Sequence, residues 1–372
     1  MMSPEAYFKE HDLWDMEKLL QHAEHNFVWV IRSQRYPNLI MLHYKDEAQW
    51  EGKWSTFARM SRGLIVDMKN QKVLAYPFDK FFNMGQEPEV SYENLLQAGK
   101  FTTSEKLDGS MLILFQDPET GKLHFTTKGS FDSEHGSYAE QYLPADVPPG
   151  LDEFTYVFEL IAKRFQIVID YKKKNYPEGI YLIGIRHRRS NKMLSHEDVQ
   201  LIANKWGLPT FKMYEFGSLD SLIEQSKTLN VLEEGYVLHY PDQNLFVKVK
   251  GPEYLRAHRF ISKLSDRYLL EMLGMGEEKT ILEIAPEEYR QDIEDKVTLY
   301  KRKYLDMTND CYQKFADAPK DTRKNFALWV KGNVDPNYQG FMFNLMDSKP
   351  IDKRKAYELI AKIENVSAET RV

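Results

Sequence analysis

The chain has 372 residues, of which 42% are hydrophobic and 28% charged, with a formal net charge of −6. This length suggests two domains, and the net charge gives no overall sign of a nucleic-acid binder. The single cysteine, Cys311, excludes an internal disulfide and a cysteine-based zinc site, and favours a reducing compartment. No apolar run approaches the roughly 18 residues of a membrane span, and the N-terminal segment lacks a signal-peptide pattern, so we expect a cytoplasmic protein without a membrane partner.

Short apolar runs separated by turn residues predict many strands in the first two-thirds of the chain. The expected strands are Phe27–Ile31, Leu39–His43, Gly63–Val66, Val73–Tyr76, Ser110–Phe115, Leu123–Thr127, Thr155–Ile161, Ile180–Arg186, Tyr236–Tyr240 and Leu245–Val249. Helices are expected at Glu5–Gln21, Ser195–Lys205 and Ser218–Leu229. The mixture predicts an α+β domain.

The pattern changes after Gly251-Pro252, where strand signals fade. Apolar residues then recur at helical spacing with charged residues on the other face, namely Ile293, Val297, Tyr300, Tyr304, Met307 and Cys311. This stretch predicts a helix of about six turns. We therefore expect a domain boundary near residue 255, with an all-helical second domain over residues 256–372.

The most informative motif is Lys106-Leu-Asp-Gly-Ser110, which precedes the apolar run Met111–Phe115. Asp-Gly between two strand patterns predicts a tight turn, and such a turn would lift the Lys106 side chain into a cleft. A lysine amine held there can attack the α-phosphate of a nucleotide and carry the nucleotide covalently. The motif is short, and an exposed lysine beside an ordinary turn is the alternative.

This chemistry requires a neutral amine, whereas a free lysine titrates near 10.4. We expect neighbouring cations and partial burial to lower the pKa of Lys106. The candidate cations, which would also neutralise phosphates, are Arg62, Lys80, Lys128, Lys248 and Lys250. Lys248 and Lys250 are two apart on a predicted strand and so point to one face; the alternative is a solvated edge strand.

Three carboxylates are candidates for binding a divalent metal ion. Glu159 lies in an otherwise apolar strand, Glu234 introduces another, and Asp108 belongs to the lysine turn. A buried carboxylate needs a partner or a metal, and oxygen ligands suit Mg²⁺. A salt bridge for Glu159 and an ordinary turn position for Glu234 remain open.

Basic residues form four short clusters. They are Lys172-Lys173-Lys174, Arg186-His187-Arg188-Arg189, Lys301-Arg302-Lys303 and Lys353-Arg354-Lys355. Each alone is typical of a solvated face, whereas several together are consistent with a surface that tracks phosphates.

Taken in chain order, these elements resemble a known family. The order is Arg62-Gly63, Lys80-Phe-Phe-Asn83, Lys106-x-Asp-Gly-Ser110, Lys128-Gly129, Phe158-Glu159, Glu234-Gly-Tyr-Val237 and Lys248-x-Lys250. It resembles the covalent nucleotidyltransferase superfamily, and within it the bacteriophage-type, tRNA-repair RNA ligases of RNA ligase family 1. The resemblance extends over nearly the whole chain.

The resemblance implies an ATP-dependent RNA ligase that joins 5′-phosphate and 3′-hydroxyl ends through a lysyl-AMP and an RNA-adenylate. Its expected fold is α+β, with an N-terminal nucleotidyltransferase (adenylyltransferase) domain over residues 1–255. That domain would contain antiparallel sheets with helices, as in DNA ligases and ATP-grasp enzymes. The all-α domain over residues 256–372 would bind RNA or tRNA.

The resemblance also implies residue roles. Lys106 would carry AMP, and the ATP phosphates would be bound by Arg62, Lys80, Lys248 and Lys250. Asp108, Glu159 and Glu234 would organise Mg²⁺ or Mn²⁺, and Gly109 would permit close approach to the ribose. Lys128 and Phe82 would belong to the pocket, and Val237 and the strand Tyr181–Arg186 would flank the adenine. Contacts to RNA would come from Lys301, Arg302, Lys303, Lys353, Arg354 and Lys355.

The implied partners are RNA ends, including nicked tRNA, and a polynucleotide kinase-phosphatase that prepares them. A monomer in the host cytoplasm is expected if the gene belongs to a phage. The alternatives are a DNA ligase, an mRNA-capping guanylyltransferase, and a non-catalytic RNA-end-binding protein. DNA ligases and capping enzymes normally place an OB-type β-barrel after the Lys-x-Lys strand, where this sequence predicts helices.

Overall fold

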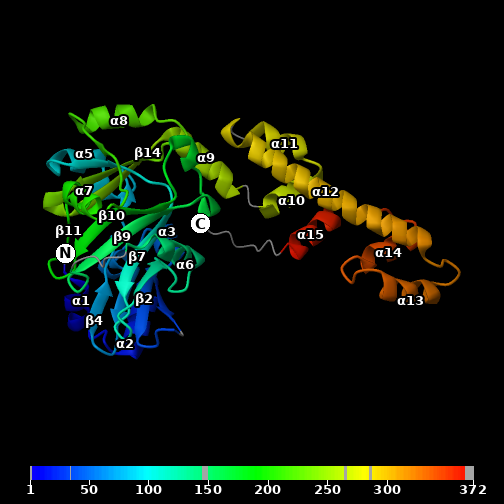
Figure 1. Ribbon diagram of the computed structural model, residues 1–372, viewed down its shortest axis with the longest axis horizontal. Helices are drawn as coiled ribbons and strands as arrows, with labels where there is room; N and C mark the ends of the chain where they lie inside the picture. Colours follow the sequence, from blue (N-terminus) through cyan, green and yellow to red (C-terminus); the bar gives the residue numbers. More distant parts are fainter. Residues whose placement is uncertain (1, 34, 145–149, 264–265, 285–286, 365–372) are drawn as a thin grey trace. The chain divides into compact units, whose positions relative to one another are not determined.

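A computed structural model describes residues 2–33, 35–144, 150–263, 266–284 and 287–364. The chain divides into two compact units, Met1–Leu255 and Arg256–Val372 (Figure 1). The first unit contains three β-sheets and several helices, whereas the described part of the second contains helices alone. The architecture is therefore α+β followed by an all-helical region, as the sequence predicts.

The first sheet has four antiparallel strands in sequential order. They are β1 (Val28–Arg32), β2 (Leu39–Tyr44), β3 (Arg62–Asp67) and β4 (Lys72–Ala75). Both faces are covered: Ile40 and Leu42 of β2 pack in one apolar cluster, and Leu39 and Met41 pack in another. This two-sided burial explains why β2 has a continuous apolar run instead of an alternating pattern.

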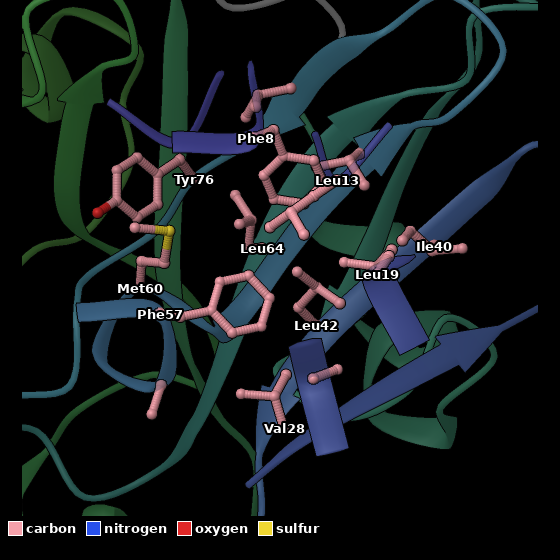
Figure 2. Packing of buried hydrophobic residues seen from close by; sticks show 14 residues of the cluster. Phe8, Leu13, Leu19, Val28, Ile40, Leu42, Phe57, Met60, Leu64 and Tyr76 are labelled. Atoms are coloured by element: carbon pink, nitrogen blue, oxygen red, sulfur yellow. The ribbon is translucent and has the colours of Figure 1, made fainter. Parts of the chain in front are cut away.

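Helices cover one face of the first sheet and close the cluster that Figure 2 shows. They are α1 (Pro4–Glu10), α2 (Met16–His25) and α4 (Thr56–Met60); the short α3 (Asp46–Trp50) follows β2. In this cluster Phe8 from α1, Leu19 from α2 and Phe57 from α4 are all fully buried against Leu42 and Leu64. The other face of the sheet packs on Ile113 and Phe115 of the second sheet.

The second sheet has five antiparallel strands in the order β11-β10-β9-β7-β8. They are β7 (Ser110–Gln116), β8 (Leu123–Thr127), β9 (Phe154–Ile161), β10 (Gly179–His187) and β11 (Lys192–Met193). The third sheet has the order β12-β6-β13-β14-β5, in which only the short β5 runs parallel to its neighbour. Its strands are β5 (Phe82–Asn83), β6 (Thr102–Glu105), β12 (Met213–Tyr214), β13 (Gly235–Tyr240) and β14 (Leu245–Lys250).

The remaining helices of the first unit pack beside these two sheets. They are α5 (Tyr92–Gln97), α6 (Glu134–Ala139), α7 (His196–Lys205) and α8 (Leu219–Lys227). Ser195 and Ser218 cap α7 and α8 by accepting backbone N–H bonds, which satisfies donors that the first turn leaves open. Leu95 of α5 and Leu222 of α8 share one core with the third sheet.

The second unit contains a long helix, α12, with shorter helices packed along it. The helices are α10 (Asp266–Met275), α11 (Glu278–Ile284), α12 (Glu287–Asp317), α13 (Arg323–Asn333), α14 (Gln339–Met346) and α15 (Lys353–Ile363). A further helix, α9 (Pro252–Lys263), crosses the boundary between the units. The predicted apolar stripe of α12 is confirmed, since Val297, Tyr300, Met307 and Cys311 are buried. At 31 residues the helix is longer than the six turns predicted.

Two sequence predictions of local structure are wrong. The expected helix Glu5–Gln21 is two helices, because Asp12 adopts a left-handed backbone (φ 55°) and Asp15 caps a new helix. The strand β6 was not predicted at all, because Thr102–Glu105 is polar; its residues are nevertheless mostly buried between β12 and β13. Within the described residues, no helix is long and apolar enough to cross a membrane.

We expect Phe57→Ala to lower the free energy of unfolding by about 3–5 kcal/mol, because Phe57 is fully buried at the centre of the cluster in Figure 2. Leu20→Ala is the control, since Leu20 is 43% exposed on α2, and its expected loss is below about 1 kcal/mol. Urea unfolding measures both. Equal losses would contradict this description of the core.

Candidate active site

The Lys106 motif connects two sheets. β6 ends at Glu105 in the third sheet, and β7 begins at Ser110 in the second sheet. The position of the motif between two strands is confirmed, but the predicted tight turn is wrong: the two strands do not pair, and residues 106–109, called the Lys106 turn below, cross between the sheets with a bend at Gly109. The Lys106 backbone N–H donates to the carbonyl of Gly235 at 2.9 Å, which fixes the nucleophile candidate beside β13.

Glu234 holds two of the predicted lysines. Its carboxylate lies 2.8 Å from Lys106 Nζ and 2.9 Å from Lys250 Nζ. Glu234 is only 2% exposed, and each lysine side chain is 19% exposed. Removing one charge from a buried set of ion pairs strongly destabilises the folded protein. Glu234 therefore fixes the positions of both amines.

The prediction that the Lys106 pKa is lowered is wrong for the nucleotide-free protein. Burial lowers the pKa, but the carboxylates of Glu234, Glu159 and Asp108 outweigh burial, and the net pKa is raised. The neighbouring cations predicted from the sequence act on Lys248 instead. Burial, followed by Arg62 and Lys106, lowers the pKa of Lys248 well below its usual value.

A second group of cations lies close together without counter-ions. The group consists of Arg62, Lys80, Lys128 and Lys248; after burial, the Arg62 guanidinium is the strongest influence that lowers the pKa of each of the three lysines. Within the described residues none of the four has a carboxylate partner, and the buried Nη1 atom of Arg62 has no hydrogen-bond partner. Removal from water and the Arg62 guanidinium lower the pKa of Lys80 and of Lys128 to about 8. An anion bound among these cations would reduce the repulsion between them.

Aromatic rings position these cations. Lys248 Nζ lies 4.3 Å from the centre of the Phe81 ring, and the Arg62 guanidinium carbon lies 5.3 Å from it. Lys80 Nζ lies 4.7 Å from the Trp54 ring and donates to Gln49 at 3.1 Å. Such cation–π contacts stabilise a charge without neutralising it.

Several further residues belong to this site and were not predicted from the sequence. Gln49 and Trp54 carried no motif signal, and Phe81 was passed over in favour of Phe82. Phe82 is buried in the apolar core, whereas Phe81 is only partly buried. His43 is a further member, since burial and then Lys128 and Arg62 lower its pKa to about 3. Its only sequence signal is a polar residue within an apolar strand.

The three predicted metal ligands play different structural parts. Asp108 Oδ2 accepts N–H bonds from Val168 and Ile169, both at 2.9 Å, and Oδ1 accepts from the Tyr254 hydroxyl at 2.8 Å. In the described residues no set of three His, Cys, Asp or Glu side chains is arranged to hold a metal. The role of the three carboxylates at a metal stays a prediction; in this structure Asp108 is engaged with the backbone.

Glu159 retains the character of a cation ligand. One of its oxygens accepts the Gly109 N–H at 3.0 Å. Burial raises its pKa to about 7, with Lys106 opposing this effect and Glu234 adding to it. Burial thus disfavours the charged carboxylate of Glu159 despite the nearby Lys106, and carboxylate oxygens such as those of Glu159 and Glu234 suit a hard divalent cation.

Gly109 is required by packing. A Cβ atom there would lie 2.3 Å from the carbonyl oxygen of Leu160 and 3.0 Å from Glu159 Cγ. Any side chain would push the turn away from β9. The predicted glycine is thus needed to seat the turn, in addition to any approach by a ligand.

The residues expected to flank a base form part of an apolar surface. Val237 is partly buried, together with Phe81, Met111 and Ile183, around a small buried cluster. Within the expected flanking strand Tyr181–Arg186, most residues are buried and Ile183 is the partly buried exception. A register shift between Leu182 and Gly184 places Ile183 at a bulge.

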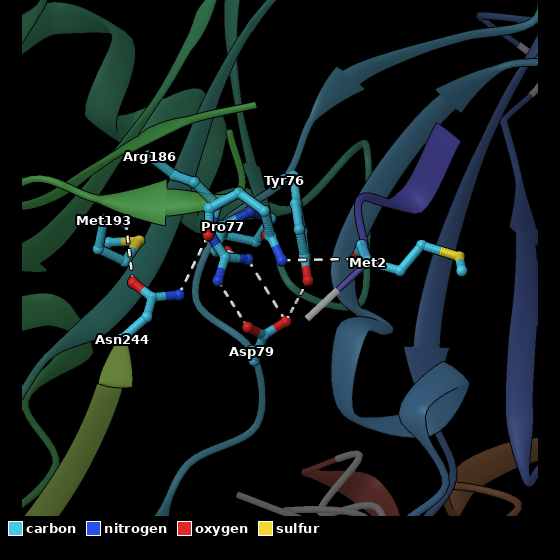
Figure 3. Close-up of polar contacts among 8 residues, drawn as sticks. Met2, Tyr76, Pro77, Asp79, Arg186, Met193 and Asn244 are labelled. Carbon is cyan, nitrogen blue, oxygen red and sulfur yellow. Dashed lines mark hydrogen bonds and ion pairs between the residues drawn. The ribbon is translucent and has the colours of Figure 1, made fainter. Parts of the chain in front are cut away.

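Arg186 belongs to a buried clamp behind the site (Figure 3). Its guanidinium pairs with Asp79 at 2.5 Å, donates to the Pro77 carbonyl at 2.8 Å and lies 3.8 Å from the Tyr76 ring centre. Arg186 is therefore not part of a solvated phosphate surface, although Arg189 of the same predicted cluster is exposed. Arg188 likewise donates to backbone carbonyls, including that of Leu151 at 2.8 Å. The clamp holds the segment that continues into Lys80.

The expected RNA contacts of the second unit are mostly paired. Lys301 pairs with Glu278 at 2.9 Å, Lys303 with Glu364 at 2.6 Å and Arg354 with Glu358 at 3.2 Å. Arg302 lies 3.9 Å from Asp306. Lys353 and Lys355 have no carboxylate partner in the described part of the chain.

Comparison with known proteins places the chain in a family. The family model described as RNA ligase matches residues 60–148 and 151–254, just over half of the chain. The chain therefore belongs to the RNA ligase family. The match covers every predicted site residue of the first unit, from Arg62 to Lys250.

Individual relatives agree with this assignment. A putative RNA ligase of Thermovibrio ammonificans is 30% identical over 65% of this chain and 63% of its own length. An RNA ligase of Rhodothermus phage RM378 is 25% identical over 74% of this chain and 79% of its own length. The chain thus spans less than two-thirds of the Thermovibrio protein. The solved structure of an archaeal ATP-dependent RNA ligase, 13% identical, has a similar fold (TM-score 0.50, covering 79% of this chain and 78% of that chain).

We expect Asp79→Asn to lower the free energy of unfolding by about 3–5 kcal/mol, because it leaves the Arg186 charge buried without a partner. The double variant Asp79→Asn/Arg186→Met should recover much of this loss, since both charges are then absent. Asp242→Asn, at an exposed position, is the control. Additive losses in urea unfolding would contradict the clamp.

Proposed function

We propose that this protein is an ATP-dependent RNA ligase that seals a 5′-phosphate to a 3′-hydroxyl. The observation that carries the proposal is the arrangement of two sets of cations around one turn. Lys106 and Lys250 are held by Glu234, whereas Arg62, Lys80, Lys128 and Lys248 lack counter-ions in the described residues. A triphosphate supplies the missing negative charge, and its α-phosphate would then lie within reach of Lys106.

In the first step the Lys106 nitrogen forms a P–N bond to the α-phosphate of ATP. The bond from that phosphorus to the bridging oxygen breaks, and pyrophosphate leaves. The amine must first lose a proton, and Glu234, at 2.8 Å, is the nearest carboxylate. Arg62, Lys80 and Lys248 would stabilise the charge on the leaving pyrophosphate.

In the second step the 5′-phosphate of RNA attacks the phosphorus of lysyl-AMP, and the P–N bond breaks. In the third step the 3′-hydroxyl attacks the RNA phosphate, a phosphodiester forms and AMP leaves. Lys106 is needed only to make the RNA-adenylate. A divalent cation bound by Glu159 and Glu234 would neutralise part of the phosphate charge in these steps.

The apolar surface of Phe81, Met111, Ile183 and Val237 supports a place for the adenine base. An apolar slot beside polar groups is typical of sites that bind a small molecule with a flat ring. The absence of strands after β14 in the described residues separates this chain from ligases and capping enzymes that carry an OB-type barrel there.

The second unit would bind the RNA substrate. Lys353 and Lys355 are the predicted contacts that have no carboxylate partner among the described residues. A kinase that supplies 5′-phosphates fits the same reaction. One relative, from Autographa californica nuclear polyhedrosis virus, is named a putative bifunctional polynucleotide kinase/RNA ligase, and this chain covers 34% of it.

The direct test is incubation with ATP labelled at the α-phosphate, in the presence of Mg²⁺. We expect covalent label on the wild type and none on Lys106→Ala, because the attacking nitrogen is gone. Lys100→Ala, an exposed lysine outside the site, should label like the wild type. Labelled GTP and NAD should not transfer.

Sealing of a pre-adenylylated RNA provides the matched readout. Lys106→Ala should still seal this substrate, since the lysine's step is already complete. Label on Lys106→Ala, or none on the wild type, would overturn the proposed mechanism.

A further inference from the structure

The group formed by Arg62, Lys80, Lys128 and Lys248, called the cation cluster below, borders an uncharged side chain. This is His43 of β2, which the pairing of β2 with β3 sets directly opposite Arg62. The register shifts immediately before His43, an irregularity of the kind that redirects a side chain. Because residues directly opposite on antiparallel strands project to one face, the His43 ring and the Arg62 guanidinium share one side of the sheet.

The segment that follows β8 lies against the same imidazole ring. A Cβ atom on Gly129 would lie 3.7 Å from His43 Cδ2. The same segment packs on β3, since a Cβ atom on Gly63 would lie 2.9 Å from Lys128 Cα. Three segments that are distant in sequence therefore meet at His43, and they hold the ring beside the cations of β3 and of the segment after β8.

His43 has hydrogen-bonding capacity that the protein does not use. Burial, followed by Lys128, Arg62 and Lys80, lowers its pKa to about 3, against a smaller opposing effect of the Ser61 backbone. The ring is therefore neutral near pH 7, with one N–H donor and one acceptor nitrogen. Within the described part of the chain its Nδ1 atom is buried and has no hydrogen-bond partner. Because Nδ1 is enclosed, Nε2 is the ring nitrogen that a ligand can meet.

An uncharged donor suits a phosphate oxygen at this place. A further positive charge would add to the repulsion within the cation cluster, whereas an imidazole N–H donates to an anionic oxygen without adding charge. Hydrogen bonds to an ionised acceptor are also stronger than those between neutral groups. The site next to His43 is thus fitted for a phosphate group whose charge the cations already balance.

His43 belongs to the part of the cluster that is distant from the nucleophile. Lys106 is among the charges that lower the pKa of Lys248. The cations that act on His43 are those named above, and Arg62 is common to both sets. With the α-phosphate at Lys106, the phosphate chain would therefore pass Arg62 and end beside His43.

We propose that His43 Nε2 donates a hydrogen bond to the terminal phosphate of the nucleotide, and that this contact makes the site prefer a triphosphate to a diphosphate. The inference rests on the proposed adenylylation by ATP and deepens it, because it assigns the preference for nucleotide length to a residue outside the predicted motifs. The same hydrogen bond would hold the pyrophosphate as it leaves, since the terminal phosphate belongs to that product.

The test compares the binding of two non-reactive nucleotides to the full chain, from which bound AMP is first removed with pyrophosphate. In both nucleotides a methylene group joins the α- and β-phosphorus atoms, so Lys106 cannot be adenylylated; one is a triphosphate and the other a diphosphate. For His43→Leu we expect calorimetric titration with Mg²⁺ to show triphosphate affinity at least about tenfold lower, the size of a hydrogen bond to a charged group. Diphosphate affinity should change less than about twofold, because the acceptor is missing.

Two further variants make the outcome specific. His43→Gln keeps an N–H donor near the position of Nε2 and should retain most of the triphosphate affinity. His22→Leu is the matched control, because His22 is also partly buried with a pKa lowered first by burial, but lies on α2 beside other histidines. It should bind both nucleotides like the wild type.

An unchanged preference for the triphosphate in His43→Leu would overturn the inference, as would equal losses for the two nucleotides. Equal triphosphate affinities of His43→Leu and His43→Gln would contradict the donor role. The diphosphate affinity shows in each case that the variant is folded. A wild type that forms no lysyl-AMP would instead overturn the proposed function.

Discussion

The buried carboxylate of Glu234 is the interaction on which the site depends. It lies between Lys106 Nζ and Lys250 Nζ, at 2.8 and 2.9 Å, and so ties the crossover turn to the end of β14. The backbone reinforces this link, because the Lys106 N–H donates to Gly235 and the Gly251 N–H donates to Glu234. Gly235 has a φ of 141°, and a Cβ atom there would lie 2.1 Å from a carbonyl oxygen of β14. Glycine is needed at this position so that Glu234 can reach inward.

The charges around this carboxylate fall into two groups with different tasks. Lys106, the proposed nucleophile, shares the buried carboxylate of Glu234 with Lys250, and nearby carboxylates raise the pKa of Lys106 in the nucleotide-free protein although burial opposes them. Arg62, Lys80 and Lys248 have no carboxylate partner in the described residues. Because they repel one another, binding of an anion between them is favourable. On this account, binding of a polyphosphate and release of the Lys106 proton are linked, because both redistribute charge around Glu234.

Sequence patterns predicted the scaffold well, since strands such as β2 and β14 are specified by their own residues. The pairing of Lys248 and Lys250 on one face also follows from local geometry. The errors concern partners that are distant in the chain. The Asp108 carboxylate binds the backbone 60 residues away, and Arg186 of β10 pairs with Asp79, 107 residues away in the loop between β4 and β5. Phe81, which was not predicted, lies beside the cations together with Phe82: the Lys248 ammonium lies 4.3 Å from the Phe81 ring centre, and the Lys80 ammonium lies 5.6 Å from the Phe82 ring centre.

The most direct test of the account is the titration of Lys106 in the nucleotide-free protein, followed by NMR of isotopically labelled lysine side chains and assigned with Lys106→Arg. The account predicts a pKa above the ordinary value of about 10.4 in the wild type, because Glu234 stabilises the ammonium form. In Glu234→Gln the pKa should fall, since burial then acts with less opposition. A wild-type pKa well below the ordinary value, or no change in the variant, would contradict the central role of Glu234.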